Sequence, residues 1–130
     1  MAIEKGLKGS VEKVVGETDS ADYFGNKGFH LYGTPALVGL LEYACGKAIE
    51  PHLPPGSGTV GTIVNIKHLA PTPLGMKVRA EAELKEVDGR RLVFHVEAFD
   101  EKEKIAEGEH ERYLVDLDRF FTKVGNKKKG

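Results

Sequence analysis

The chain has 130 residues, of which 30% are charged and 40% hydrophobic, and its formal net charge is −1. This length suits one domain, and the balanced charge gives no electrostatic reason to expect a nucleic-acid partner. No apolar run reaches the roughly 18 residues of a membrane span, and a single cysteine, Cys45, excludes an intramolecular disulfide framework. Because the N-terminal segment also lacks the apolar stretch of a signal peptide, we expect a cytoplasmic protein.

The composition also bears on the temperature at which the source organism grows. Gln is absent, whereas Glu and Lys are abundant. Proteins from hot environments tend to avoid thermolabile residues and to use networks of charge. The composition therefore favours a thermophilic source.

The first predicted element is a Val-rich strand at residues 7–15. A glycine-rich segment with four aromatic residues follows, from Gly16 to Gly33. Such a long loop in a small domain is often functional, because aromatic side chains in a loop need something to cover. We expect Phe24 and Phe29 to belong to a mobile cover over an apolar pocket.

A long helix is predicted from Thr34 to Ile49, with Thr34 as N-cap and Pro35 as first helical residue. Its residues are apolar nearly all round, so we expect it to be largely buried. Glu42 is its one acid, at the edge of the most apolar face. A buried carboxylate is costly unless it is paired, so Glu42 either rims the core beside a basic partner or is a catalytic group with a raised pKa.

Four strands complete the predicted domain, at residues 59–69, 76–85, 92–98 and 101–117. Asp88-Gly89 indicates a two-residue hairpin between the second and third of them. Gly108 indicates a bulge or a close approach in the last strand. We expect one domain over residues 1–124 and a flexible basic tail at 125–130. The order of elements matches an α+β hot-dog fold, in which a five-stranded antiparallel sheet wraps one long central helix.

His68 ends a row of alternating apolar residues on its strand, after Val64 and Ile66. A lone histidine in such a place is more often structural than catalytic. An acid at the helix edge and a histidine on the facing sheet could nevertheless meet in one pocket, where they could carry out acid–base catalysis.

Thr34 combines a hydroxyl with the positive end of a helix, which suits a developing oxyanion. Capping the helix would compete for the same oxygen atom. Thr34 and Glu42 are eight residues apart, about 12 Å along a helix, so they cannot hydrogen-bond directly. Either a substrate spans this gap, the helix starts later, or a second subunit contributes.

Other reactive motifs are absent from the sequence. The remaining histidines show no HxxxH or HxH spacing, so no metal site is expected. The chain contains no phosphate-binding glycine loop and no GxSxG elbow. We therefore expect neither a metal nor a cofactor.

Two stretches carry a resemblance to a known family. The segment GTPALVGLLEYACGKAIEPHLPPGSGTVGTIVNIKHLAPTPLGMKV resembles the fluoroacetyl-CoA thioesterase family of hot-dog proteins, and GEHERYLVDLDRF resembles the last strand of that family. The similarity spans about Gly33 to Val124. It implies a homodimer or higher oligomer that hydrolyses an acyl-CoA thioester, with coenzyme A only as part of the substrate. It places the family's catalytic residues on Thr34, Glu42 and His68, and its acyl-pocket glycine on Gly61.

The chain departs from the fluoroacetyl-specific pattern in two places. Pro35 follows Thr34 where that enzyme has glycine, and the segment before Gly33 matches weakly, which leaves the lid residues unaligned. We therefore expect a general short-chain acyl-CoA thioesterase. Leu37 and Val38 of the helix, opposite Gly61, are predicted to form a narrow acyl slot. Arg112 is one of several basic residues that could bind the phosphates of coenzyme A, the others being Arg90, Arg91 and Lys127–Lys129.

Two other functions fit the same fold. A hot-dog acyl-CoA hydratase or dehydratase also uses an acid and a histidine, but the chain lacks the Asp-x4-His motif of those enzymes. A non-catalytic module that binds acyl-CoA or another small apolar ligand would not require the complete set of Thr34, Glu42 and His68.

Overall fold

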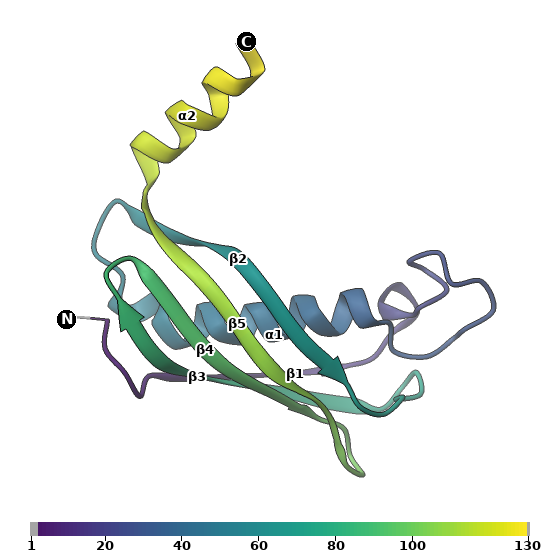
Figure 1. Ribbon diagram of the computed structural model, residues 1–130. Coiled ribbons are helices and arrows are strands. Elements are labelled where there is room, and N and C mark those ends of the chain that lie inside the picture. Colours follow the sequence, from purple (N-terminus) through teal and green to yellow (C-terminus); the bar gives the residue numbers. More distant parts are fainter. Residues whose placement is uncertain (1–2, 130) are drawn as a thin grey trace.

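The computed structural model describes residues 3–129, which form one antiparallel sheet with a long helix against one face (Figure 1). The elements in chain order are β1 (Lys8–Val14), η1 (Glu17–Asp19), α1 (Thr34–Ile49), η2 (Glu50–His52), β2 (Ser57–His68), β3 (Lys77–Asp88), β4 (Arg91–Phe99), β5 (Lys104–Asp116) and α2 (Leu117–Lys129). The strand order in the sheet is β1-β3-β4-β5-β2. The predicted combination of one long helix and five antiparallel strands is confirmed.

Alternation along β3 and β4 builds the core. On β3 the apolar residues Val78, Ala80 and Leu84 are buried and alternate with charged residues on the other face. On β4, Leu92, Phe94, Val96 and Ala98 are buried in the same way. Gly89 allows the two-residue turn between these strands, because its φ of 61° lies in the left-handed region that glycine adopts without strain.

The helix α1 lies mainly over the β1 and β3 half of the sheet, not over its centre. Gly9 on β1 permits this close contact, since a Cβ there would clash with the backbone of Ala44 and Ala48. The opposite side of α1 faces solvent, and Tyr43 is 57% exposed. The prediction of a largely buried helix is therefore wrong for one of its sides. The helix is buried on the side that carries Leu37, Leu41, Ala44, Cys45, Ala48 and Ile49.

A β-bulge in β2 decides which of its residues face the helix. The register against β5 shifts between Gly61 and Ile63. Gly61 and His68 are seven residues apart, so strict alternation would send them to opposite faces. The extra residue of the bulge puts both on the helix side of the sheet, since Gly61 pairs with Arg112 and His68 with Ala106.

Two segments extend beyond the sheet and its helix (Figure 1). The aromatic loop, residues 16–33, connects β1 to α1, and backbone hydrogen bonds from Ala21 to Leu31 and from Asp22 to Phe29 hold it together. Its mobility stays a prediction. The helix α2 was not expected from the sequence, and it includes most of the predicted basic tail, since it ends at Lys129. Gly130 lies outside the described residues, and a domain boundary at residue 124 stays a prediction.

Among the described residues, no helix is both long and apolar enough to cross a membrane.

Candidate functional site

Thr34 and His68 meet at the N-terminus of α1. The Thr34 Oγ1 atom lies 2.8 Å from Nδ1 of His68, which is within hydrogen-bonding distance. The prediction that Thr34 caps the helix is wrong, because the N-cap residue is Gly33 and Thr34 is already helical. The threonine hydroxyl is therefore engaged by the histidine and not by the helix backbone.

The surroundings of His68 favour the neutral form of its imidazole. Burial lowers the pKa of His68 below its ordinary value of 6.5. Its Nε2 atom is buried and, among the described residues, has no hydrogen-bond partner. An unpartnered buried nitrogen beside a hydrogen-bonded hydroxyl is a candidate for proton transfer with a substrate.

Glu42 belongs to a second group of polar side chains, further along α1. Its Oε1 atom accepts a hydrogen bond from Nη1 of Arg112 at 3.2 Å and lies 3.7 Å from Nε2 of His110. Arg112 is itself fixed by Thr59, to whose hydroxyl and carbonyl oxygens it donates at 2.9 and 3.0 Å. The carboxylate is thus held by a preorganised arginine, and its side chain is 39% exposed.

The hydrogen bonds of His110 fix its tautomer. Nε2 lies 3.1 Å from Nη1 of Arg112, which can only donate, so Nε2 must accept. Nδ1 therefore carries the proton and donates it to the carbonyl oxygen of Ile63 at 2.8 Å. The side chain is 1% exposed, and burial lowers its pKa below the ordinary value. His110 is a neutral support for Arg112 and Glu42.

Gly61 lies directly against this second group. A Cβ at this position would be 3.0 Å from Oε1 of Glu42 and 3.1 Å from Cε1 of His110. Both distances are tighter than most Cβ contacts, so a larger residue here would require Glu42 or His110 to shift. The residue that the sequence resemblance assigned to an acyl pocket is therefore adjacent to Glu42.

The other predicted substrate residues fall in different places. Arg112 contacts Glu42, as described. Val38 is partly exposed on α1, whereas Leu37 is fully buried in the core and offers no open surface. Phe24 and Phe29 are 49% and 53% exposed in the aromatic loop.

Within one protomer, the two groups of polar side chains are separate. Thr34 and His68 form one pair, and Glu42, His110 and Arg112 form the other, two helical turns away. The sequence-based estimate of about 12 Å between the first and ninth residues of a helix therefore applies, because α1 begins at Thr34. A hollow of about 300 Å³ borders Glu42 and Arg112.

Other hollows and clusters lack comparable chemistry. A larger hollow of about 520 Å³ lies over β1, β3 and β4 and is lined mainly by polar and charged residues, among them Lys8, Glu81 and Glu97. In the aromatic loop, Glu17, Asp22 and His30 bring possible metal-ligand atoms within 4.8 Å of one another. This cluster is largely open to solvent, and surface carboxylates often gather without binding a metal.

Sequence reasoning missed His110 as a site residue. The available signal was its place in β5, where the residues facing the helix side include Gly108, His110 and Arg112. Gly108 was expected to mark a bulge or close approach. The close approach is confirmed, since a Cβ there would clash with the carbonyl oxygen of Asn65 in β2. A histidine and an arginine next to it on the same inner face predict a polar group in the core.

Comparison with known proteins identifies the family of the chain. The family described as fluoroacetyl-CoA-specific thioesterase matches residues 15–118. The fluoroacetyl-CoA thioesterase of Streptantibioticus cattleyicolor is 43% identical over 97 residues, which are 75% of this chain and 70% of that protein.

Solved structures give the same result. The structure of the fluoroacetyl-CoA thioesterase superposes with a TM-score of 0.89 at 35% identity, covering 98% of both chains. A threonine-to-serine variant of that enzyme in complex with acetyl-CoA gives a TM-score of 0.91 at 34% identity, covering 96% of this chain and 98% of that one. A thioesterase superfamily member from Thermus thermophilus gives 0.89 at 28% identity, covering 98% and 94%. The predicted hot-dog fold and thioester hydrolase class are confirmed, and this chain belongs to the fluoroacetyl-CoA-specific thioesterase family.

Proposed function

We propose that the protein hydrolyses short-chain acyl-CoA thioesters to a free acid and coenzyme A. The observation that carries this proposal is the 2.8 Å contact between Thr34 Oγ1 and His68 Nδ1 at the N-terminus of α1. It joins a hydroxyl and a neutral imidazole at a place where backbone N–H groups can stabilise an oxyanion.

Each of the three residues has a role in the proposed reaction. The thioester carbonyl docks near the start of α1, and the helix N–H groups bind the growing negative charge. Glu42 attacks the carbonyl carbon or activates the water that does so. His68 accepts a proton or gives one to the leaving thiolate, and Thr34 holds the imidazole and the acyl group in position.

A homodimer would bring the two separate groups together. The strand β2 pairs with β5 on one side, and its other edge is unpaired within residues 3–129. Antiparallel pairing of two copies of β2, about an axis between Gly61 and His68, would set Glu42 of one protomer beside Thr34 and His68 of the other. It would also cover Ile63 and Val64, which are 49% and 50% exposed. A second subunit is thus the solution we favour for the gap within one chain.

The acyl pocket is proposed to be small. Leu37 and Leu41 are buried in the core and leave no open surface for an acyl group. Gly61 leaves little more than the space of a missing methyl group beside Glu42 and His110. A pocket of this kind gains roughly 0.8 kcal/mol per methylene until it is full and then loses affinity through overpacking. We therefore expect acyl groups of about two to four carbons to be preferred.

The proposal is tested by free-thiol release from a series of acyl-CoA substrates, with fluoroacetyl-CoA among them. We expect kcat/KM to be greatest at about two to four carbons and to fall beyond about six. An optimum at about twelve carbons or more would refute the small pocket. Retention of acyl-CoA without thiol release would favour the binding module, and hydration of an unsaturated acyl-CoA without thiol release would favour the hydratase.

Light scattering tests the assembly separately. The chain mass is 14.2 kDa, so a species of twice this mass, or of a higher even multiple, is expected at micromolar concentration. A stable monomer would contradict the shared site.

A further inference from the structure

The helix α2 projects away from the sheet (Figure 1), and two of its apolar side chains are largely exposed. Phe121 and Val124 are 62% and 50% exposed, and Phe121 makes an edge contact with Phe120 at 5.4 Å between ring centroids. At 100° per residue, these three side chains share one side of the helix with Leu117. None of them is buried by the described part of the chain.

The charge of α2 differs in sign from that of the rest of the protein. The helix carries five basic residues and one acidic residue, a net charge of +4. Since the whole chain has a net charge of −1, the remainder carries −5. The aromatic loop, residues 16–33, contains three acidic residues and one lysine, a net charge of −2 with histidine neutral. A basic helix and an acidic loop are complementary in charge.

The aromatic loop also has uncovered apolar side chains. Tyr23, Phe24 and Phe29 are 62%, 49% and 53% exposed, and Tyr23 and Phe24 are in edge contact at 5.3 Å between centroids. Within one protomer this loop and α2 lie at opposite ends of the molecule (Figure 1). Two exposed aromatic surfaces of opposite charge therefore cannot cover each other in the same chain.

The topology brings them together between two chains. At the start of β2, a Cβ on Gly58 would lie 3.1 Å from Leu117, so α2 leaves the sheet there. At the end of β2, His68 contacts Thr34, which directly follows the aromatic loop. Antiparallel pairing of two β2 strands sets the start of one beside the end of the other. The base of α2 in one protomer then lies next to the aromatic loop of its partner.

From these observations we infer that α2 docks on the aromatic loop of a second copy of the chain, with Phe121 and Val124 packed against Phe24 and its aromatic neighbours. The inference rests on the proposed homodimer. It makes α2 part of the wall beside the partner's Thr34 and His68. A second copy fits better than an anionic lipid surface, because the remaining charge of −5 would be repelled from such a surface.

Disulfide trapping tests this contact directly. In a Cys45→Ser background, Val124→Cys is combined with Phe24→Cys and the protein is oxidised mildly. The matched control combines Phe24→Cys with Asn126→Cys, which lies on the opposite side of α2 at 100° per residue. We expect a covalent dimer of twice 14.2 kDa for the first pair and at least about tenfold less for the control.

The outcomes separate this inference from the proposed function. Equal trapping in both pairs, in a protein that is a dimer by light scattering and releases thiol from acetyl-CoA, would overturn the α2 contact alone. A monomer would overturn the contact together with the dimer on which it rests.

A second pair of variants tests the contact without cysteine. Phe121→Glu with Val124→Glu should raise the dimer dissociation constant by about tenfold or more, whereas Thr122→Glu with Asn126→Glu should not. These pairs change the charge of α2 equally, so the difference reports the apolar face. Equal dissociation constants for the two pairs, or binding of the intact protein to anionic vesicles that the first pair abolishes, would contradict the inference.

Discussion

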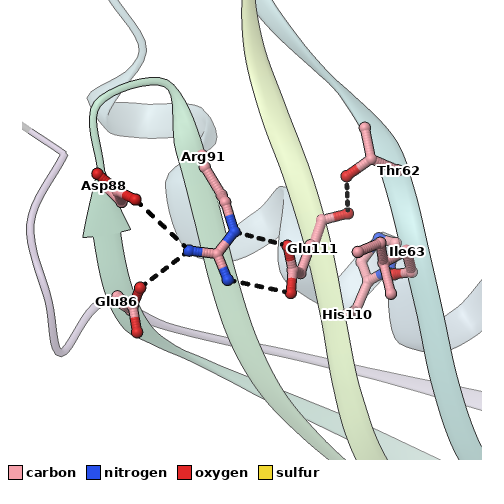
Figure 2. Close-up of polar contacts among 7 residues, drawn as sticks. All are labelled: Thr62, Ile63, Glu86, Asp88, Arg91, His110 and Glu111. Carbon is pink, nitrogen blue, oxygen red and sulfur yellow. Dashed lines mark hydrogen bonds and ion pairs between the residues drawn. The ribbon is translucent and has the colours of Figure 1, made fainter.

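Two neighbouring residues of β5, Glu111 and Arg112, form ion pairs on opposite faces of the same sheet. On the outer face, Glu111 accepts two hydrogen bonds from Arg91, at 2.8 and 3.3 Å, and Arg91 also contacts Glu86 and Asp88 (Figure 2). On the inner face, Arg112 holds Glu42 and contacts the buried His110. Alternation along one strand thus separates the ion pairs of the outer face from the polar group that contains Glu42 on the inner face.

The two arginines differ in burial and not in the number of contacts, whereas among their carboxylate partners the outer Glu111 is the more buried, 14% exposed against 39% for Glu42. Arg91 is 42% exposed in its side chain, so water and salt can replace what it binds. Arg112 is 14% exposed, and its loss would leave Glu42 and a buried histidine without their partner. The outer pair is one of several ion pairs that Arg91 makes with acidic side chains. The inner Arg112 instead sets the position of the Glu42 carboxylate.

The largest expected effect distinguishes the proposed catalytic acid, Glu42, from the acid on the outer face, Glu111. Glu42→Gln and His68→Ala should each reduce thioester hydrolysis by at least about 10²-fold, the usual scale for acid–base groups. Glu111→Gln, the matched change on the outer face, should leave kcat within about twofold. Thiol-release kinetics measure all three, with circular dichroism to show that each variant is folded. Near-normal turnover in the first two would mean that they are structural residues.

The two arginines give the next largest contrast. Arg112→Met should lower kcat by about tenfold or more, because it releases the carboxylate that Arg112 orients. Arg91→Met removes a guanidinium with as many contacts and should leave kcat unchanged. Steady-state kinetics of the two variants side by side test the comparison, and equal losses would contradict it.

A smaller effect is expected from filling the space beside Glu42. Gly61→Ala places a methyl group against Oε1 of Glu42 and Cε1 of His110, so it should lower kcat/KM by about several-fold and shift the preferred acyl chain shorter. Asn65→Ala, which replaces an exposed residue of the same strand, is the control for a general effect on β2. A kcat/KM profile unchanged by Gly61→Ala would remove this glycine from the acyl pocket.

The pH dependence should follow the two inner histidines. Burial lowers the pKa of both His68 and His110 below 6.5 in the folded protein. The unfolded chain therefore binds more protons as the pH falls below about 6.5, so the free energy of unfolding should decrease there and level off below the folded pKa values. Urea unfolding between pH 4 and 8, roughly the range in which histidine titrates, measures this. His110→Gln should reduce the slope, and an unchanged slope would assign the effect to other groups.

The smallest change is expected on the outer face. Arg91→Lys should cause only a slight, salt-dependent shift in the urea midpoint, because exposed ion pairs contribute little and are screened. A large loss of stability that persists at high salt would show that the outer network matters more than its exposure suggests.

Much of the fold followed from local patterns. The alternation in β3 and β4, the turn at Gly89 and the limits of α1 each depend on neighbouring residues, and all were predicted closely. The helix α2 was missed because none of its residues is buried by the described part of the chain and its last residues are basic. A helix that is stabilised by packing against something else carries only a weak local signal.

The candidate site was only partly predictable for a similar reason. Glu42 and His68 stood out because each is polar among apolar neighbours. The bulge that turns Gly61 to the same face as His68 has no clear signature in the sequence, and the contact of Arg112 with Glu42 joins residues seventy positions apart. Such contacts depend on which strands and helices lie beside one another in the fold, and not on residue type.

The central claim is that each site combines Thr34 and His68 of one protomer with Glu42 of its partner, and subunit mixing tests it most directly. Glu42→Gln and His68→Ala dimers should each have little activity alone, but in a hybrid of the two, one of the two shared sites has all three residues intact. After complete exchange of equal amounts, about a quarter of wild-type activity should return, since half of the dimers are hybrids with one working site each. If native mass spectrometry shows the hybrid dimer and no activity returns, all three residues act within one chain and the shared site is wrong.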